Sequence, residues 1–266
     1  MLEYLSLETL EHDMCDGIAV VPSLSNLRTL CIMYSRLGEK NLEAILSACP
    51  GLCTFVYEAA SNQLEGQCVM LDGGDHFQPS SAVGYLRRHS RTLKSVHLDL
   101  RLRGWSPLTE GQQVTPVFNF ADFTALEHLF INASEVFGTS WKESPADLRC
   151  LMKLLPPSIT SLHLAGEVGN ARLRLAKGLL DLAEAVSQGE FPQFKQIRCD
   201  IQQLLDDDYD VAATFAAVGV DFGYDSWPVG KVPFQENDNL SLPKSLEPMP
   251  VPDSDDSDLF PFDFCF

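Results

Sequence analysis

The chain has 266 residues, a hydrophobic content of 45% and a formal net charge of −18 at pH 7. This acidity argues against nucleic acid or an anionic membrane as the main partner, because phosphate binding needs clustered Lys and Arg. No apolar run approaches the roughly 20 residues of a membrane-spanning helix and no secretory signal is visible, so we expect a cytoplasmic or nuclear protein with reduced cysteines.

A pattern of three apolar residues at offsets 0, 3 and 5 recurs along the chain. "ITSLHLAG" gives Ile159, Leu162 and Leu164, for example. The copies recur at intervals of 20 to 41 residues, which is typical of a leucine-rich-repeat solenoid. The first residues of the copies are Leu7, Leu27, Leu52, Leu93, Leu126, Ile159 and Phe194.

The spacing predicts one parallel strand per copy. Offsets 3 and 5 point to the same side of a strand, and stacked copies then share a continuous core. Between the copies, apolar residues at helical spacing predict return helices within 39–50, 80–89, 145–157 and 174–191, with Ser80 or Ser81 as N-cap of the second. The expected fold class is therefore an α/β leucine-rich-repeat solenoid of about seven repeats.

The two ends of the repeat array differ. At the start, Leu7 and Leu10 would occupy the first two apolar positions and His12 the third, with no polar cap before them. Either an upstream domain covers this repeat, or the repeat packs on something else. After the last copy, residues 204–227 predict one more helix and a closing edge strand, in which Val220, Phe222 and Tyr224 alternate with other residues.

The last 36 residues form a separate region in composition. Residues 231–266 contain six prolines, eight acidic residues and two lysines, which predicts a disordered tail after a solenoid domain at 1–230. The tail ends in "LFPFDFCF". This segment is either simply unstructured or a docking motif, since acidic and aromatic segments can fold onto partners.

Polar and aromatic residues lie between the apolar anchors and should share the concave face of the solenoid. Aromatic and Arg side chains dominate interface energetics, and the acidic surroundings favour a protein partner with basic patches. A long insertion at 100–122 adds Trp105 as a further anchor candidate. The candidate contact residues on the strands are His97, Asp99, His128, Phe130, Asn132, His163, Arg198 and Asp200.

No motif supports catalysis, a metal or a cofactor. Ser95, His97 and Asp99 share one face of a strand, but neighbours at i and i+2 are roughly 6.5–7 Å apart, whereas a triad needs contacts of about 2.6–3.2 Å. His97 and His163 should lie about 9.6 Å apart, too far to share one metal ion. We therefore expect a protein that is not an enzyme.

The segment "ACPGL" resembles the cysteine-containing leucine-rich repeats of fungal F-box proteins, in which a helix ends in C-P-x-L. Cys49, Pro50 and Leu52 match this signature. The F-box itself is absent from the chain. The resemblance implies a non-enzymatic recognition scaffold, the substrate-binding part of an F-box-type ubiquitin ligase receptor. The alternative is a structural assembly or dimerisation module that docks through its uncapped first repeat; the oligomeric state is left open.

Overall fold

The computed structural model describes residues 2–8, 22–60, 77–101, 119–137, 149–166, 172–200, 205 and 210–225. All of them belong to one compact unit, Met1–Lys231. Their backbone forms a single sheet of eight parallel strands together with six α-helices, so the predicted α/β class is confirmed. The predicted tail at 231–266, the insertion residue Trp105 and the predicted His12 all lie outside the described residues.

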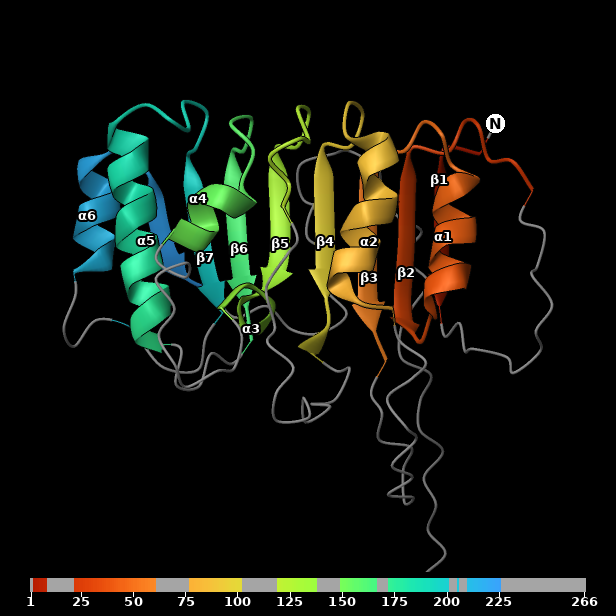
Figure 1. Ribbon diagram of the computed structural model, residues 1–266, viewed down its shortest axis with the longest axis horizontal. Helices are drawn as coiled ribbons and strands as arrows, with labels where there is room; N and C mark the ends of the chain where they lie inside the picture. The colour runs from red at the N-terminus through yellow and green to blue at the C-terminus, as the bar shows by residue number, and fades with distance from the viewer. Residues whose placement is uncertain are drawn as a thin grey trace, which may run out of the picture. The chain divides into compact units, whose positions relative to one another are not determined.

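The strands follow one another across the sheet in sequence order, and every neighbouring pair is parallel. In Figure 1 the helices α1, α2, α4, α5 and α6 lie on one side of this sheet. The strands are β1 Tyr4–Glu8, β2 Thr29–Ser35, β3 Thr54–Ala59, β4 Ser95–Asp99, β5 His128–Asn132, β6 Ser161–Ala165, β7 Gln196–Asp200 and β8 Asp221–Tyr224. The helices are α1 Glu39–Ser47, α2 Pro79–Leu86, the 3-10 helix η1 Arg87–His89, α3 Ala133–Phe137, α4 Cys150–Leu154, α5 Arg172–Ser187 and α6 Val211–Ala217. Among these helices none is long and apolar enough to cross a membrane.

From β2 to β7 the strands pair in the register that the apolar repeat predicts. Leu30 pairs with Phe55, Leu129 with Leu162 and so on, which places offsets 3 and 5 of each copy side by side. These side chains and the offset-0 residues are buried. The closing strand after the seventh copy is also confirmed, because β8 pairs with β7.

The prediction for the first copy is wrong by five residues. The first strand is Tyr4–Glu8, in which Leu5 pairs with Leu30 and Leu7 with Ile32. The offsets 0, 3 and 5 are occupied by Leu2, Leu5 and Leu7 in the earlier register, whereas the register that starts at Leu7 places His12 in the third apolar position. Burying an unpartnered polar side chain is costly, so the earlier register is preferred.

The predicted cap of α2 is also wrong. The N-cap residue is Gln78, the helix begins at Pro79, and no side-chain cap bond is made within the helix. The cap comes from the neighbouring helix: the Glu39 Oε1 atom accepts a hydrogen bond from the Gln78 backbone N (3.3 Å) and one from Ser81 Oγ (2.8 Å). A carboxylate at a helix N-terminus is favourable, and here it also ties α1 to α2.

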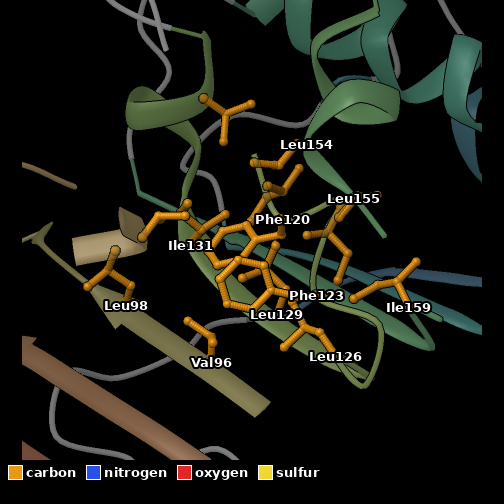
Figure 2. Packing of buried hydrophobic residues seen from close by; sticks show 14 of the residues in the cluster. Val96, Leu98, Phe120, Phe123, Leu126, Leu129, Ile131, Leu154, Leu155 and Ile159 are labelled. Carbon is orange, nitrogen blue, oxygen red and sulfur yellow. The ribbon is translucent and has the colours of Figure 1, made fainter. Parts of the chain in front are cut away.

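The core runs between the sheet and the helices through all the described copies. Figure 2 shows Phe120 and Phe123 packed among strand residues of β4 and β5 and against Leu154 and Leu155 from the following copy. The two phenylalanine rings lie edge to face with centroids 5.1 Å apart. Each copy therefore buries its apolar side chains against its neighbours, as the repeat pattern requires.

Candidate functional site

The face of the sheet opposite the helices carries the side chains at offsets 2, 4 and 6 of each copy, and we call it the polar face. Backbone pairing aligns each offset into a row across the strands, in the order expected from β2 onward. The central row, at offset 4, contains Cys31, Val56, His97, Phe130, His163 and Arg198.

The polar face is buried in one part and partly exposed in the other. On β2–β5 the central row is 1% exposed at Cys31, Val56, His97 and Phe130. The offset-6 row is equally covered at Glu58, Asp99 and Asn132, which are 2–3% exposed. On β6 and β7, His163, Arg198 and Asp200 are partly exposed, as is His128 at the edge of β5. Of the predicted contact residues, His97, Asp99, Phe130 and Asn132 are therefore buried, whereas His128, His163, Arg198 and Asp200 are partly exposed.

Three aromatic rings of the central row stack along the polar face. The centroids of His97 and Phe130 are 3.9 Å apart with the rings nearly parallel, and those of Phe130 and His163 are 4.7 Å apart. Burial lowers the pKa of His97 to about 3 and that of His163 to about 4, despite the opposing charges of Asp99 and Asp200 respectively. Both imidazoles are therefore neutral near pH 7, and the stack behaves as an apolar strip across β4, β5 and β6.

One cation, Arg101, lies over this stack. Its Nε and Nη2 atoms donate to the Asp99 carboxylate at 2.7–3.1 Å, and Nη1 donates to Asp200 Oδ2 at 2.7 Å. The guanidinium carbon lies 5.9 Å from the centroid of the Phe130 ring, within the range of a cation–π contact. A single side chain thus connects β4 to β7, and we call this arrangement the Arg101 strap.

The strap is held by buried charge. Burial alone raises the pKa of the Asp99 carboxyl, but the hydrogen bonds and positive charge of Arg101 outweigh burial and hold that pKa below its usual value. Burial likewise lowers the pKa of Arg101, and the interactions with Asp99, Asp200 and Glu58 raise it above its usual value overall. Three carboxyl groups therefore act on one guanidinium.

Neighbouring residues leave room for the strap. Gly166 follows β6 with a φ of +87°, and a Cβ atom there would lie 3.3 Å from Arg101 Cγ and 3.5 Å from Asn132 Nδ2. Its backbone N donates to the Asp200 carbonyl at 2.8 Å. Asn132 Oδ1 accepts a hydrogen bond from the backbone N of Leu100 (2.7 Å), which fixes the chain leading into Arg101. Glycine at this position both adopts the left-handed backbone and admits the arginine stem.

The exposed part of the polar face has its own polar contacts. Arg198 pairs with Asp221 on β8 and donates to the backbone carbonyl of Asp221 at 3.0 Å. The ring nitrogen Nδ1 of His128 lies 2.8 Å from Ser161 Oγ on the next strand. These side chains present both hydrogen-bond donors and acceptors to solvent, a composition suited to a protein interface rim.

The arrangement gives no support to a catalytic triad of Ser95, His97 and Asp99. His97 is stacked on Phe130, and its lowered pKa makes it a weak base at neutral pH. The Asp99 carboxylate is engaged by Arg101. In the part of the chain that the structure describes, no group of three or more His, Cys, Asp or Glu side chains is placed to hold a metal ion.

Arg101 is the residue at the polar face that the sequence did not single out. It stands at the start of the insertion and outside the repeat pattern, so no periodicity singles it out. The spacing Asp99-x-Arg101 directly after a strand was the available signal, because an acid at the end of the strand can pair with a base two residues later.

A scan against protein-family models finds no family that matches the chain, and a search of curated proteins finds no significant match.

Proposed function

We propose that the chain is a non-enzymatic protein-recognition scaffold of the leucine-rich-repeat kind, and that it binds its partner over the β5–β8 part of the polar face. The observation that carries the proposal is the set of partly exposed polar side chains in matched register on adjacent strands. This set consists of His128, Ser161, His163, Arg198 and Asp200.

The proposed contact site is smaller than the one that the sequence predicts, because it leaves out the buried side chains of β4 and β5. Phe130 and His97 flank the site on the neighbouring strands: both are buried, and Phe130 stacks between His97 and His163. Arg198 and His163 become the primary contact residues. Asp200 and Asp225 contribute negative charge at His163, and Asp221 pairs with Arg198. This surplus of acidic groups favours a partner segment that is basic.

Within this function, the resemblance of Cys49-Pro50-x-Leu52 to F-box repeat proteins supports a narrower proposal. The partner would be a protein substrate of a ubiquitin ligase, held while a separate part of the receptor contacts the ligase. This role requires a cytoplasmic or nuclear location. In the structure the motif is a helix end: Cys49 Sγ donates to the carbonyl of Ile45 at 3.3 Å.

The test is capture of partners by the purified chain, compared between the wild type and a His163→Ala/Arg198→Ala double variant. Arg91→Ala serves as the matched control, because Arg91 is exposed and lies outside the proposed contact set. If the double variant loses the captured proteins while the wild type and Arg91→Ala retain them, the result supports the proposed contact site. If the wild type and both variants capture the same proteins equally, the proposed contact site is wrong.

A second function, assembly through the first repeat, is favoured by a different observation. β1 is the edge strand of the sheet, and its apolar residues Leu5 and Leu7 are only partly buried while Leu2 is 52% exposed. An exposed edge strand is a template for pairing with another chain. Light scattering after size exclusion separates the two functions: a stable dimer that Leu5→Lys converts to a monomer supports assembly, and a monomeric wild type counts against it.

A further inference from the structure

The central row of the polar face ends at Gly223 on β8, a residue that contributes no side chain to it. Gly223 pairs with Arg198, the member of the row on β7. A Cβ atom at Gly223 would lie 3.3 Å from Nη1 of Arg198, 3.5 Å from Cζ and 3.7 Å from Cδ. The Arg198 side chain therefore lies across β8, in the space that a side chain at position 223 would fill.

The Arg198 guanidinium is held in this space by groups of β7 and β8. Its Nη1 atom donates to the backbone carbonyls of Ile197 and Asp221 at 3.0 Å each, and its Nη2 atom pairs with the Asp221 carboxylate. Two of its three nitrogens are thus engaged within the chain, and its charge is balanced by Asp221. The side chain nevertheless keeps 23% of its surface exposed. Because Gly223 lies against one side of the group, a partner would meet the planar surface on the side away from β8.

Planar groups occupy four successive positions of the central row, from β4 to β7. The rings of His97, Phe130 and His163 follow one another with centroids 3.9 and 4.7 Å apart, and Arg198 is the next position after His163. His97 and Phe130 are buried, whereas His163 and Arg198 are partly exposed. The exposed end of the row is therefore a surface made of an imidazole ring and a guanidinium group.

An aromatic side chain is the group that fits such a surface. The π face of an aromatic ring is attracted to a guanidinium and stacks on it, and it also stacks on an imidazole. A carboxylate fits less well, because Asp221 already balances Arg198 and the charges of Asp200 and Asp225 act on His163. The same acidic residues favour Lys or Arg beside the aromatic residue in the partner segment.

We propose that Gly223 is a positioning residue of the contact site: it lets the Arg198 guanidinium lie across β8, where it and His163 receive an aromatic side chain of a basic partner segment. The proposal rests on the proposed function and specifies the chemistry of its partner. It also accounts for a glycine within a strand, a position where glycine weakens the strand and often marks the close approach of another group.

The experiment is a titration of the full chain with two probe peptides, acetyl-Lys-Trp-Lys-amide and acetyl-Lys-Leu-Lys-amide, followed through the backbone amide shifts of β6–β8. The quantity compared is the ratio of the two dissociation constants. The proteins are the wild type, Gly223→Val, Arg198→Lys and the matched control Gly84→Val. Gly84 is exposed on α2, and a Cβ atom there would meet nothing within 4 Å.

We expect the wild type and Gly84→Val to bind the tryptophan peptide at least about fivefold more tightly than the leucine peptide. In Gly223→Val the branched side chain takes the space of the guanidinium, and Arg198→Lys keeps the charge but lacks the planar group. The preference should therefore fall to about twofold or less in both variants.

Two results would overturn the proposal. One is a wild type that does not prefer the tryptophan peptide, including one that binds neither peptide. The other is a preference that is unchanged in Arg198→Lys or in a folded Gly223→Val; if Gly223→Val does not fold, Arg198→Lys decides. Because the probes are free peptides, a missing preference leaves the capture test of the proposed function unaffected, so the two failures can be told apart.

Discussion

The polar face has the same construction on β3–β5 as on β6–β7, yet the two parts differ in accessibility. Both continue the same rows with the same backbone register. On β3–β5 the central row is sealed: Val56, His97 and Phe130 are 1% exposed. On β6 and β7, His163 and Arg198 remain partly exposed. The repeat therefore determines which side chains share a face of the sheet. The exposure of those side chains also depends on residues outside the repeat, such as Arg101, which lies over Phe130.

The largest expected effect is that of Phe130→Ala in the sealed part. Truncating a buried phenylalanine removes its apolar contacts and leaves a cavity, which costs about 3–5 kcal/mol in the free energy of unfolding. Phe222→Ala on β8 is the matched change, and should cost about half as much because that side chain is only partly buried. Urea unfolding measures both free energies. A smaller loss of stability for Phe130→Ala than for Phe222→Ala would contradict the division of the polar face into a buried and an exposed part.

The ring stack should also make the stability depend on pH. Because the folded-state pKa values of His97 and His163 are depressed to about 3 and about 4, the unfolded chain binds more protons below pH 6.5. The stability that neutral histidines provide is therefore complete above about pH 6.5 and is lost progressively as the pH falls toward 4. Between pH 7.5 and pH 5 the loss should be about 2 kcal/mol per histidine.

The variant that tests this pH dependence is His163→Phe, which keeps a ring in the stack and removes one titrating group. The charges of Asp200 and Asp225 act on His163 against burial, and those of Arg101 and Arg198 act with it. Unfolding measured at several pH values should show a shallower slope between pH 7.5 and pH 5 in the variant. An unchanged slope would mean that His163 has the same pKa in the folded chain as in the unfolded chain.

Arg101→Gln tests whether the strap stabilises the sealed part. It leaves the Asp99 carboxylate buried beside Glu58 without the guanidinium, and should lower the free energy of unfolding by about 2–4 kcal/mol. Arg91→Gln removes the same charge from an exposed site and should change it by less than about 0.5 kcal/mol. Similar losses in the two variants would assign the effect to net charge rather than to the strap.

Gly166→Ala and Gly189→Ala separate backbone strain from crowding at the strap. The two glycines have nearly the same φ, +87° and +83°, but a Cβ atom would contact Arg101 only at Gly166 and would meet nothing within 4 Å at Gly189. Both alanines carry the cost of a left-handed residue, about 1–2 kcal/mol. Gly166→Ala should lower the free energy of unfolding by about 1 kcal/mol more than Gly189→Ala does, as measured by thermal or urea unfolding. Equal losses in the two variants would show that the Arg101 side chain moves aside without cost.

The smallest effect on stability is expected for Arg198→Ala in the exposed part. Its partner Asp221 is 67% exposed in the side chain, and such surface ion pairs contribute about 0–1 kcal/mol. The same variant should weaken partner capture, because Arg198 is a primary contact of the proposed site. A loss of several kcal/mol in stability with unchanged capture would reverse the assignment and make Arg198 a structural residue.

The sequence determined the sheet because the spacing of the apolar residues in the repeat is that of one face of a β-strand. Three apolar positions at a fixed spacing, confirmed as buried for every copy from Leu27 to Phe194, specify the strands, their order and their register. The first copy lies five residues earlier than the repeat predicted, because apolar residues at offsets 0 and 3 start at Leu2 as well as at Leu7, and pairing with β2 shows which of the two forms the strand.

Only the tertiary structure decided which part of the polar face is exposed to solvent. His97 and Phe130 are buried, and α2 is capped by Glu39, through contacts between residues that are far apart in the sequence. Arg101 is the clearest case. Its charge is visible in the sequence, but its bond to Asp200, 99 positions away, exists because the parallel strands bring β4 and β7 within reach of one side chain.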